Sequence, residues 1–274
     1  MSASIQSRRD AFRALHRSGC FVIPNPWDAG SARYLESLGF KALATTSSGY
    51  AWSQGCADGS ASREVTLCYL REMVEATSLP VNADFESGYA KDPEGVAESV
   101  RMAIETGVAA LSIEDSTYDE RKPLRDIDDA VKRMRAARAA IDESRTGTML
   151  VGRAENFFVG RPDLDDAIRR LNAYSEAGAD CLYAPGIRTR EQITAVVAAV
   201  APKPVNLLIG STSEFTLKDV EAMGVRRVSV GGALARCAWA GFMRAARTIA
   251  SDGRFDGFAQ AASGKELNEL FAHR

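Results

Sequence analysis

Carboxylates stand at the ends of two short apolar segments in the first half of the sequence. Asp84 and Glu86 close the segment VNADFE, and Glu114 closes the segment ALSIE. An apolar strand that ends in a charged residue places that residue at the mouth of an α/β barrel, where this fold assembles its active sites. Under strand alternation, Asp84 and Glu86 point to the same side while Phe85 packs away. The sequence therefore predicts three carboxylates at one rim.

Three carboxylates so close together would repel one another, and their pKa values would rise unless a cation or protons offset the charge. A divalent metal ion is the economical explanation. The ligands would all be oxygens, with no His or Cys among them, and this favours Mg2+ or Mn2+ over Zn2+. The alternative is that these acids are strand caps or surface residues. That alternative is common for one acid alone and uncommon for three at consecutive strand ends.

An arginine, Arg153, ends the next apolar segment, MLVGR. An arginine that faces acids at a barrel mouth can hold a carboxylate or phosphonate and stabilise negative charge on an oxygen. A structural salt bridge to Glu86 or Glu155 is an equally good interpretation. The run TTSSG at 45–49 offers hydroxyls and backbone amides that could cup an anion, although such clusters are usually turns.

Eight short β-rich segments, each followed by a stretch with helical spacing, would position these residues. They are residues 21–25, 42–46, 81–84, 110–114, 149–153, 181–185, 205–209 and 227–231. Glycines that stop the preceding helix stand shortly before four of them, at Gly39, Gly107, Gly178 and Gly224. Eight alternations predict an α/β fold of the (β/α)8 TIM-barrel type. A doubly wound open sheet is the alternative, but the segment after the first strand, PNPWD, is not its glycine-rich phosphate turn.

The 274 residues fit one barrel domain, since no linker is long enough to divide the chain. A long apolar helix is expected at 233–250, and residues 252–274 are expected to form a C-terminal helical tail. The net charge of -2 gives no global attraction to nucleic acid or to an anionic membrane. No apolar run approaches the roughly 20 residues needed to cross a bilayer, and the N-terminus does not resemble a signal peptide. We therefore expect a cytoplasmic protein.

Histidine and cysteine chemistry have little support in the sequence. The two histidines, His16 and His273, lie near the ends of the chain, so a histidine-based catalytic site would be hard to build. The five cysteines are scattered and form no CxxC motif, and this indicates buried free thiols rather than disulfides or a structural zinc site.

The combination TTSSG, GCADG, PVNADFESGY, SIEDS, GRAENF and SVGGALAR resembles the phosphoenolpyruvate mutase/isocitrate lyase superfamily over nearly the whole chain. The resemblance implies Mg2+ held directly or through water by Asp58, Asp84, Glu86 and Glu114. It also implies a substrate carboxylate bound by Thr46, Ser47 and Ser48, with Arg153 lying over the same substrate and Asn206 as a further contact. A homo-oligomer, dimer or tetramer, is implied too, and the 233–250 helix either swaps between its subunits or packs within its own.

The sequence departs from the family pattern in two places. Glu86 stands where the family more often has Asp, a change that preserves the charge on a longer arm. The loop at 116–124 contains no Cys, whereas isocitrate and methylisocitrate lyases carry their catalytic Cys there. This departure predicts that the protein is not a Cys-dependent lyase of that kind. Lys122 is either a remnant of the mutase's gating loop or, as the better interpretation, an exposed loop lysine.

Together with these residues, the resemblance implies a Mg2+-dependent lyase or phosphonomutase acting on a small 2-oxo acid of the oxaloacetate or phosphoenolpyruvate/phosphonopyruvate type. Mg2+ and Arg153 would both favour an enolate over the neutral ketone, so that the bond at C3 can break heterolytically. Arg153, Glu114 and Asp84 are the expected catalytic residues. One alternative is an oxaloacetate decarboxylase specifically. The other is a non-catalytic protein that binds a 2-oxo acid.

Overall fold

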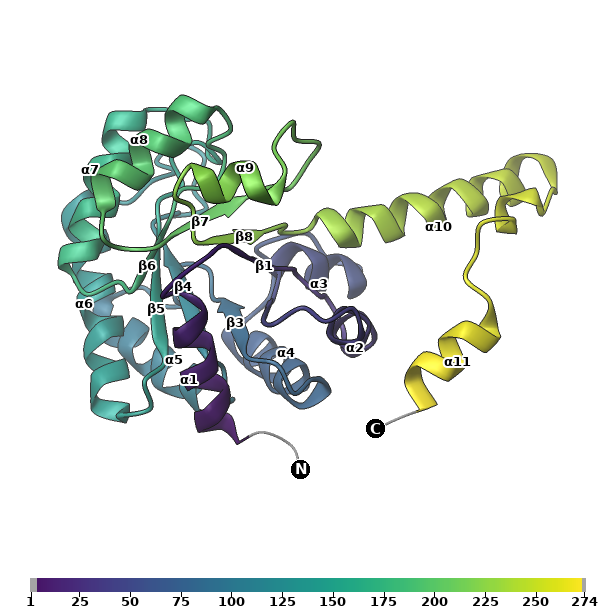
Figure 1. The fold of residues 1–274 in the computed structure, drawn as a ribbon, viewed down its shortest axis with the longest axis horizontal. Helices are drawn as coiled ribbons and strands as arrows, with labels where there is room; N and C mark the ends of the chain where they lie inside the picture. Colours follow the sequence, from purple (N-terminus) through teal and green to yellow (C-terminus); the bar gives the residue numbers. More distant parts are fainter. Residues whose placement is uncertain (1–3, 273–274) are drawn as a thin grey trace.

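A computed structural model describes residues 4–272, so His273 and the end of the predicted tail lie outside the described residues. Eight parallel strands alternate with helices that surround them (Figure 1). The strands are β1 Phe21–Ile23, β2 Leu43–Ala44, β3 Val81–Asp84, β4 Ala110–Glu114, β5 Met149–Arg153, β6 Cys181–Tyr183, β7 Val205–Leu208 and β8 Arg227–Ser229. Each falls inside one of the eight predicted segments.

The helices follow the same alternation. They are α1 Ile5–Leu15, α2 Ala29–Ser37, α3 Ser47–Ser53, α4 Arg63–Ala76, α5 Pro93–Glu105, α6 Ile127–Ser144, α7 Leu164–Glu176, α8 Arg190–Val200, α9 Leu217–Ala222, α10 Ala233–Asp252 and α11 Gly264–Ala272, with a 3-10 turn, η1, at Asp256–Phe258. The four predicted glycine stops are confirmed, because all have positive φ. Gly178, at φ +101°, also leaves no room for a side chain, since a Cβ there would lie 2.6 Å from Arg138.

The barrel closes between β1 and β2. The strand order β1-β8-β7-β6-β5-β4-β3-β2 leaves these two as the ends of the sheet, and the Ala44 amide donates to Pro24 O at 3.0 Å across the gap. Asn25 reinforces the closure at the rim. Its Oδ1 accepts from the Val230 amide at 2.9 Å, and its Nδ2 donates to Thr45 O at 2.9 Å. The predicted (β/α)8 barrel is confirmed.

Helix α1 packs against the end of the barrel where the strands begin, and it holds a histidine in an apolar site. His16, at the C-terminal end of α1, lies edge-on to the rings of Phe12 and Phe21 at centroid distances of 4.8 and 5.1 Å. Burial, assisted by the positive charge of Arg227, lowers the pKa of His16 to about 3. The folded protein therefore keeps this imidazole neutral throughout the physiological range.

The buried His16 predicts acid sensitivity. Below pH 6.5, the ordinary pKa of histidine, His16 is protonated in the unfolded chain, whereas in the folded chain it stays neutral until about pH 3. Lowering the pH from 7.5 to 5 should thus cost the wild type about 2 kcal/mol of unfolding free energy through this residue. Over the same pH interval, the unfolding free energy of His16→Leu should fall by about 2 kcal/mol less than that of the wild type. Urea unfolding at both pH values measures the difference. Equal losses in the two proteins would contradict a neutral, buried His16.

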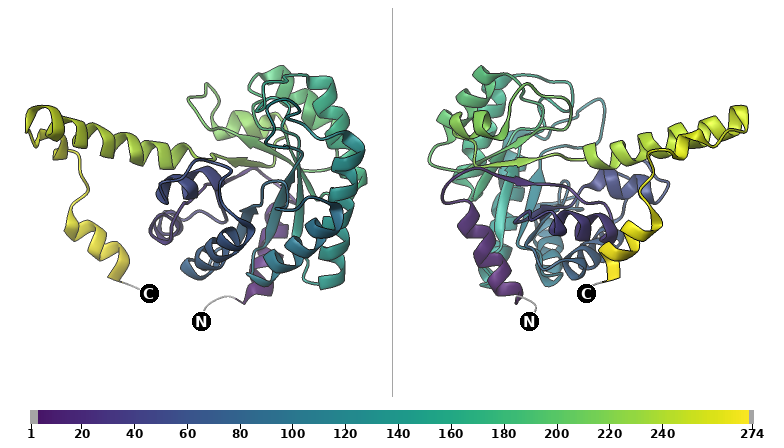
Figure 2. Two further views of the ribbon diagram at one scale, coloured as in Figure 1. Left: turned by 180° about the vertical axis from the view of Figure 1, so that it is seen from behind. Right: turned by 45° about the vertical axis from the view of Figure 1, so that its right-hand side comes forward.

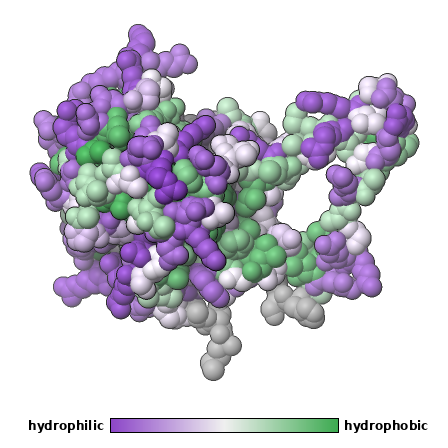
Figure 3. Space-filling model, turned by 45° about the horizontal axis from the view of Figure 1, so that its top comes forward, coloured by the Kyte–Doolittle hydropathy of each residue, from purple (hydrophilic) through white to green (hydrophobic). Residues whose placement is uncertain are grey.

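Helix α10 leaves the barrel instead of covering it. Together with η1 and α11 it forms an arm, residues 233–272, in which α10 projects from the body and α11 returns toward α2 (Figures 1 and 2). Only Ala235 of α10 is buried. Large apolar side chains are exposed along the arm: Trp239, Phe242, Met243, Phe255, Phe258, Leu267 and Phe271. Figure 3 shows apolar residues along the arm and on the barrel surface next to it.

Two other sequence expectations meet the structure here. None of the five cysteines is paired, but only Cys181 is buried, while Cys56, Cys68 and Cys237 are exposed. The expectation of buried thiols is therefore wrong for most of them, because they lie on the outer faces of helices and loops. Within residues 4–272, no helix combines the length and the apolar character needed to span a membrane.

Candidate active site

Three neighbouring strands end in the residues that form the centre of the site. Asp84 is the last residue of β3, Glu114 of β4 and Arg153 of β5, and Glu114 is directly opposite Arg153 in the sheet register. Arg153 Nη1 lies 3.1 Å from Asp84 Oδ1 and 3.3 Å from Glu114 Oε2. Its Nε forms an ion pair with Glu155, two residues further on. One guanidinium thus links three carboxylates at the barrel mouth.

Arg153 remains a cation in this setting. Its side chain is only 14% exposed, and it lies over the ring of Tyr183 at 5.2 Å from the ring centroid. Burial alone would lower its pKa, but the carboxylates of Glu155, Glu114 and Asp84 outweigh burial and raise it. The structural interpretation is confirmed by the ion pair with Glu155. Binding of a substrate carboxylate or phosphonate by Arg153 stays a prediction.

The TTSSG segment begins helix α3, and it contacts Asp84. Thr46 is the N-cap of α3 and accepts from the Gly49 amide at 3.3 Å. The amide and the hydroxyl of Ser47 each donate to Asp84 Oδ2 at 3.1 Å. The Ser47 amide is therefore used by Asp84 in this structure, so the segment orients a carboxylate of the protein as well as facing the cavity.

Strand alternation does not extend to Glu86, which corrects one expectation from the sequence. Strand β3 ends at Asp84, and Glu86 follows in a turn with φ +47°. Phe85 is fully buried, as predicted. Glu86 is 6% exposed, and its Oε1 has no hydrogen-bond partner. Burial, together with the charges of Asp84 and Asp58, raises the pKa of Glu86 to about 7.

The site holds more negative than positive charge. Besides Glu86, partial desolvation and the nearby Asp84 raise the pKa of Asp58, and burial raises the pKa values of Glu114 and Glu155. Among the described residues, Arg153 is the cation that forms ion pairs within this group of five acids, with Asp84, Glu114 and Glu155. Among residues 4–272, no three acidic, histidine or cysteine side chains are close enough to ligate one ion as they stand. The side chains instead converge on the guanidinium.

A divalent cation fits this group in charge and in ligand chemistry. All the available donors are carboxylate oxygens, as Mg2+ prefers, and the buried Glu86 Oε1 lacks a partner. An unpaired buried carboxylate oxygen is costly, and a cation would remove that cost. Asp58, Asp84, Glu86 and Glu114 are the residues that would hold it.

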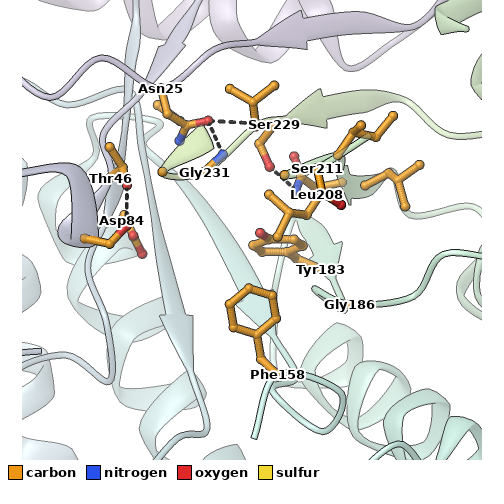
Figure 4. Close-up of a pocket in the computed structure, with 18 of the residues that line it drawn as sticks. Asn25, Thr46, Asp84, Phe158, Tyr183, Gly186, Leu208, Ser211, Ser229 and Gly231 are labelled. Atoms are coloured by element: carbon orange, nitrogen blue, oxygen red, sulfur yellow. Dashed lines mark hydrogen bonds between the residues drawn. The ribbon is translucent and has the colours of Figure 1, made fainter. Parts of the chain in front are cut away.

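A cavity of about 630 Å³ opens beside this group. Figure 4 shows Thr46 and Asp84 on one side of it, with Phe158, Tyr183 and Leu208 across from them. Most of the predicted site residues line it: Thr46, Ser47, Ser48, Asp58, Asp84, Arg153 and Asn206. Glu86 and Glu114 are not part of its wall. Among the described residues, none of those lining the cavity is a histidine, lysine or cysteine.

Asn206 lies at the floor of the cavity with its amide already engaged. It is fully buried. Its Oδ1 accepts from Arg227 Nε at 2.8 Å, and its Nδ2 donates to Ser229 Oγ at 2.9 Å. These bonds fix the barrel interior, and any contact with a substrate would have to share or displace them.

A second polar cluster supports the site from behind and was not predicted. Asp115 is 1% exposed and accepts hydrogen bonds from Tyr174 Oη at 2.5 Å, Arg170 Nη1 at 3.0 Å and the Glu155 amide at 2.8 Å. It holds the backbone of Glu155, the partner of Arg153. The SIEDS motif carries the signal, because adjacent acids on one strand must face opposite sides.

Comparisons with known proteins agree with the barrel fold. The sequence profile of the phosphoenolpyruvate phosphomutase family matches residues 12–250. A solved structure from Burkholderia cenocepacia J2315, provisionally described as a lyase/mutase, is 46% identical with a TM-score of 0.95 and covers 98% of both chains. An oxaloacetate decarboxylase from Rhodopseudomonas palustris is 33% identical over 83% of this chain and 79% of its own. A 2-methylisocitrate lyase from Halalkalibacterium halodurans is 26% identical over 96% and 89%.

Proposed function

The chain belongs to the phosphoenolpyruvate phosphomutase family, and from this premise we propose that it is a Mg2+-dependent lyase that breaks the bond at C3 of a small 2-oxo acid, with oxaloacetate decarboxylation as the best candidate reaction. Mn2+ is an acceptable substitute for a site made of oxygen ligands. The expected catalytic residues are Arg153, Asp84 and Glu114.

The observation that carries this proposal is the composition of the cavity wall. It offers a guanidinium, Arg153, beside Asp84 and Asp58, and among the described lining residues it offers no histidine, lysine or cysteine. Loss of CO2 needs a site that accepts the electrons left behind, and it needs no proton from the enzyme in that step. A reaction that needs a cysteine thiol as its acid finds none among the described residues that line this cavity. The 2-methylisocitrate lyase activity of the 26% identical relative is therefore not part of the proposal.

The residues would divide the work between binding and charge stabilisation. When bound, a divalent cation supplies positive charge beside the 2-oxo oxygen, where negative charge develops. Arg153 adds a fixed positive charge that is already oriented by Asp84, Glu114 and Glu155 before substrate binds. Thr46 and Ser48 line the cavity, and their hydroxyls would hold the substrate carboxylate. The cavity wall at Phe158 and Leu208 would exclude water from the other side.

A phosphonate substrate is the second candidate, and two arginines favour it. Arg188 and Arg236 also line the cavity. Guanidinium groups bind phosphonate oxygens well, so these arginines could hold the phosphoryl group while its bond to C3 breaks and a bond to the enolate oxygen forms. The structure thus allows a phosphonomutase reaction with the same residues stabilising the enolate.

Turnover measurements would distinguish these reactions. Oxaloacetate, phosphonopyruvate and phosphoenolpyruvate would each be followed by 1H and 31P NMR, with Mg2+ or with EDTA. Because oxaloacetate also decarboxylates without enzyme, the Arg153→Met protein at equal concentration serves as the baseline. Pyruvate formation above that baseline, lost in EDTA, is expected. Interconversion of the two phosphorus compounds would favour the mutase, and binding of all three without turnover would favour the non-catalytic alternative.

We also propose that the arm, residues 233–272, packs on a second copy of this chain in a dimer or tetramer. A helix follows β8 but does not cover its own barrel, and it exposes Phe242 at 62% and Trp239 at 37%. Apolar surface of this extent is characteristic of an interface.

The oligomer can be tested by introducing negative charges on the apolar face of α10. The double variant Trp239→Asp/Phe242→Asp should elute as a monomer in size-exclusion chromatography with light scattering, while the wild type elutes as a multiple of the 29.5 kDa chain. Lys265→Asp, on the polar surface of the same arm, should leave the assembly unchanged. A monomeric wild type would show that the arm packs differently in solution.

A further inference from the structure

The loop between β4 and α6 carries a tyrosine that reaches into the carboxylate group. Tyr118 is 55% exposed, yet its hydroxyl donates a 2.8 Å hydrogen bond to Glu114 Oε1. The Glu114 side chain is 5% exposed, and its other oxygen lies 3.3 Å from Arg153 Nη1. A neutral donor and a charged donor therefore hold the two oxygens of one carboxylate.

The ring of Tyr118 also covers the loop that carries Asp58. Gly59, the next residue, is so close to the ring that a Cβ there would lie 3.1 Å from it. A side chain at 59 would be tight against the ring, and the φ of +75° at this position also favours glycine. Through its two ends, Tyr118 connects Glu114 of β4 with the segment that holds Asp58.

The backbone of Tyr118 is strained. Its φ of +60° is rare for a bulky residue and costs free energy that glycine would not. The loop around it holds this conformation. Ser116 and Leu124 form an antiparallel bridge, and the Thr117 amide donates to Pro123 O at 3.0 Å. Backbone strain of this kind, held in place by the surrounding structure, is typical of functional sites. It therefore favours a functional role for the Tyr118 side chain.

We propose that Tyr118 is a positioning residue, whose hydroxyl orients the Glu114 carboxylate for cation binding and whose ring holds the Asp58 loop beside it. This inference rests on the proposed function for the role of the cation, and it assigns a task to the loop at 116–124. The loop is an ordered hairpin that brings a fixed tyrosine to the acids.

Tyr118→Phe tests the hydroxyl alone. Hydrogen bonds to a metal ligand typically change metal affinity by roughly 10-fold or more, so the variant should bind Mg2+ about 10-fold more weakly by isothermal titration calorimetry. At saturating Mg2+ and with a turned-over substrate, kcat should fall while KM changes little. The control is Tyr34→Phe, the same change at a half-exposed position on α2, which should match the wild type in both.

Tyr118→Gly tests the strain. Relief of the left-handed backbone should offset the lost contacts, so this variant is expected to melt no lower than the wild type while binding Mg2+ more weakly. The control is Arg145→Gly, which relieves a similar φ of +53° at the end of α6 and should leave Mg2+ binding unchanged.

Two results would overturn the role of Tyr118. One is wild-type Mg2+ affinity in Tyr118→Phe. The other is a Tyr118→Gly protein that melts several degrees lower with its Mg2+ affinity intact, because this would make the tyrosine purely structural. If the wild type itself does not bind Mg2+, the proposed function fails first, and the two failures are thus distinguishable.

Discussion

Arg153→Met is expected to lower kcat/KM for the C3 cleavage by about 10³-fold. Arg153 is the one described cation that contacts Asp84, Glu114 and Glu155 together at the barrel mouth. Its removal takes away a preorganised positive charge from the place where the electrons of the broken bond accumulate. Arg153→Lys should recover only part of the loss, since a lysine cannot bond three carboxylates in the fixed geometry of a guanidinium.

The effect is measured as kcat/KM at saturating Mg2+, with circular dichroism and thermal melting to show that the variant is folded. Arg190→Met is the matched control. Arg190 lies over the Phe215 ring at 5.4 Å and outside the cavity wall, so its loss should change kcat/KM less than about 3-fold. A folded Arg153→Met protein within 10-fold of the wild type would show that this guanidinium has no part in the reaction.

Asp115→Ala is expected to lower the free energy of unfolding by about 3 to 5 kcal/mol. The substitution removes the acceptor that the Tyr174 hydroxyl, the Glu155 amide and Arg170 share, although Arg170, whose side chain is 10% exposed, keeps its ion pair with Asp166 at 2.7 Å. Each buried donor that loses its acceptor costs about 1 to 3 kcal/mol, and the loss of one partner of a buried ion pair adds to that cost. The Glu155 backbone loses its anchor as well, so activity should fall with stability.

Urea unfolding with unchanged m value is the measurement for Asp115→Ala. Asp119→Ala gives the comparison, because Asp119 pairs with Arg121, which is 92% exposed, and such surface pairs contribute about 1 kcal/mol or less. If Asp115→Ala and Asp119→Ala lower the unfolding free energy equally little, the hydrogen bonds that Asp115 accepts behind the site do not stabilise the protein as proposed.

The barrel could be predicted from the sequence because its signals are local. Each strand is a short apolar run, and four of the preceding helices are followed by a glycine with positive φ, such as Gly107 or Gly224. The rim positions of Asp84, Glu114 and Arg153 follow from the same pattern, since the last residue of a parallel strand must lie at the barrel mouth. These three are confirmed as neighbours, whereas their catalytic role stays a prediction.

The contacts that depend on tertiary packing could not be predicted. Period-two alternation fails after Asp84, because the chain turns into a left-handed conformation at Glu86. Nothing local in the sequence indicates that Tyr118 turns inward from a polar loop. Nor does the pattern of α10 decide between packing on its own barrel and leaving it, because an amphipathic helix has the same periodicity in both places.

The most direct test of the central claim is the binding of oxalate, a planar dianion that resembles the enolate of pyruvate. Isothermal titration calorimetry would compare the wild type in Mg2+, the wild type in EDTA and Arg153→Met in Mg2+. A site built to stabilise the enolate should bind oxalate at least about 10²-fold more tightly in Mg2+ than in either of the other conditions. Equal affinity in Mg2+ and EDTA, or no binding at all, would contradict a cation-assisted enolate site at the barrel mouth.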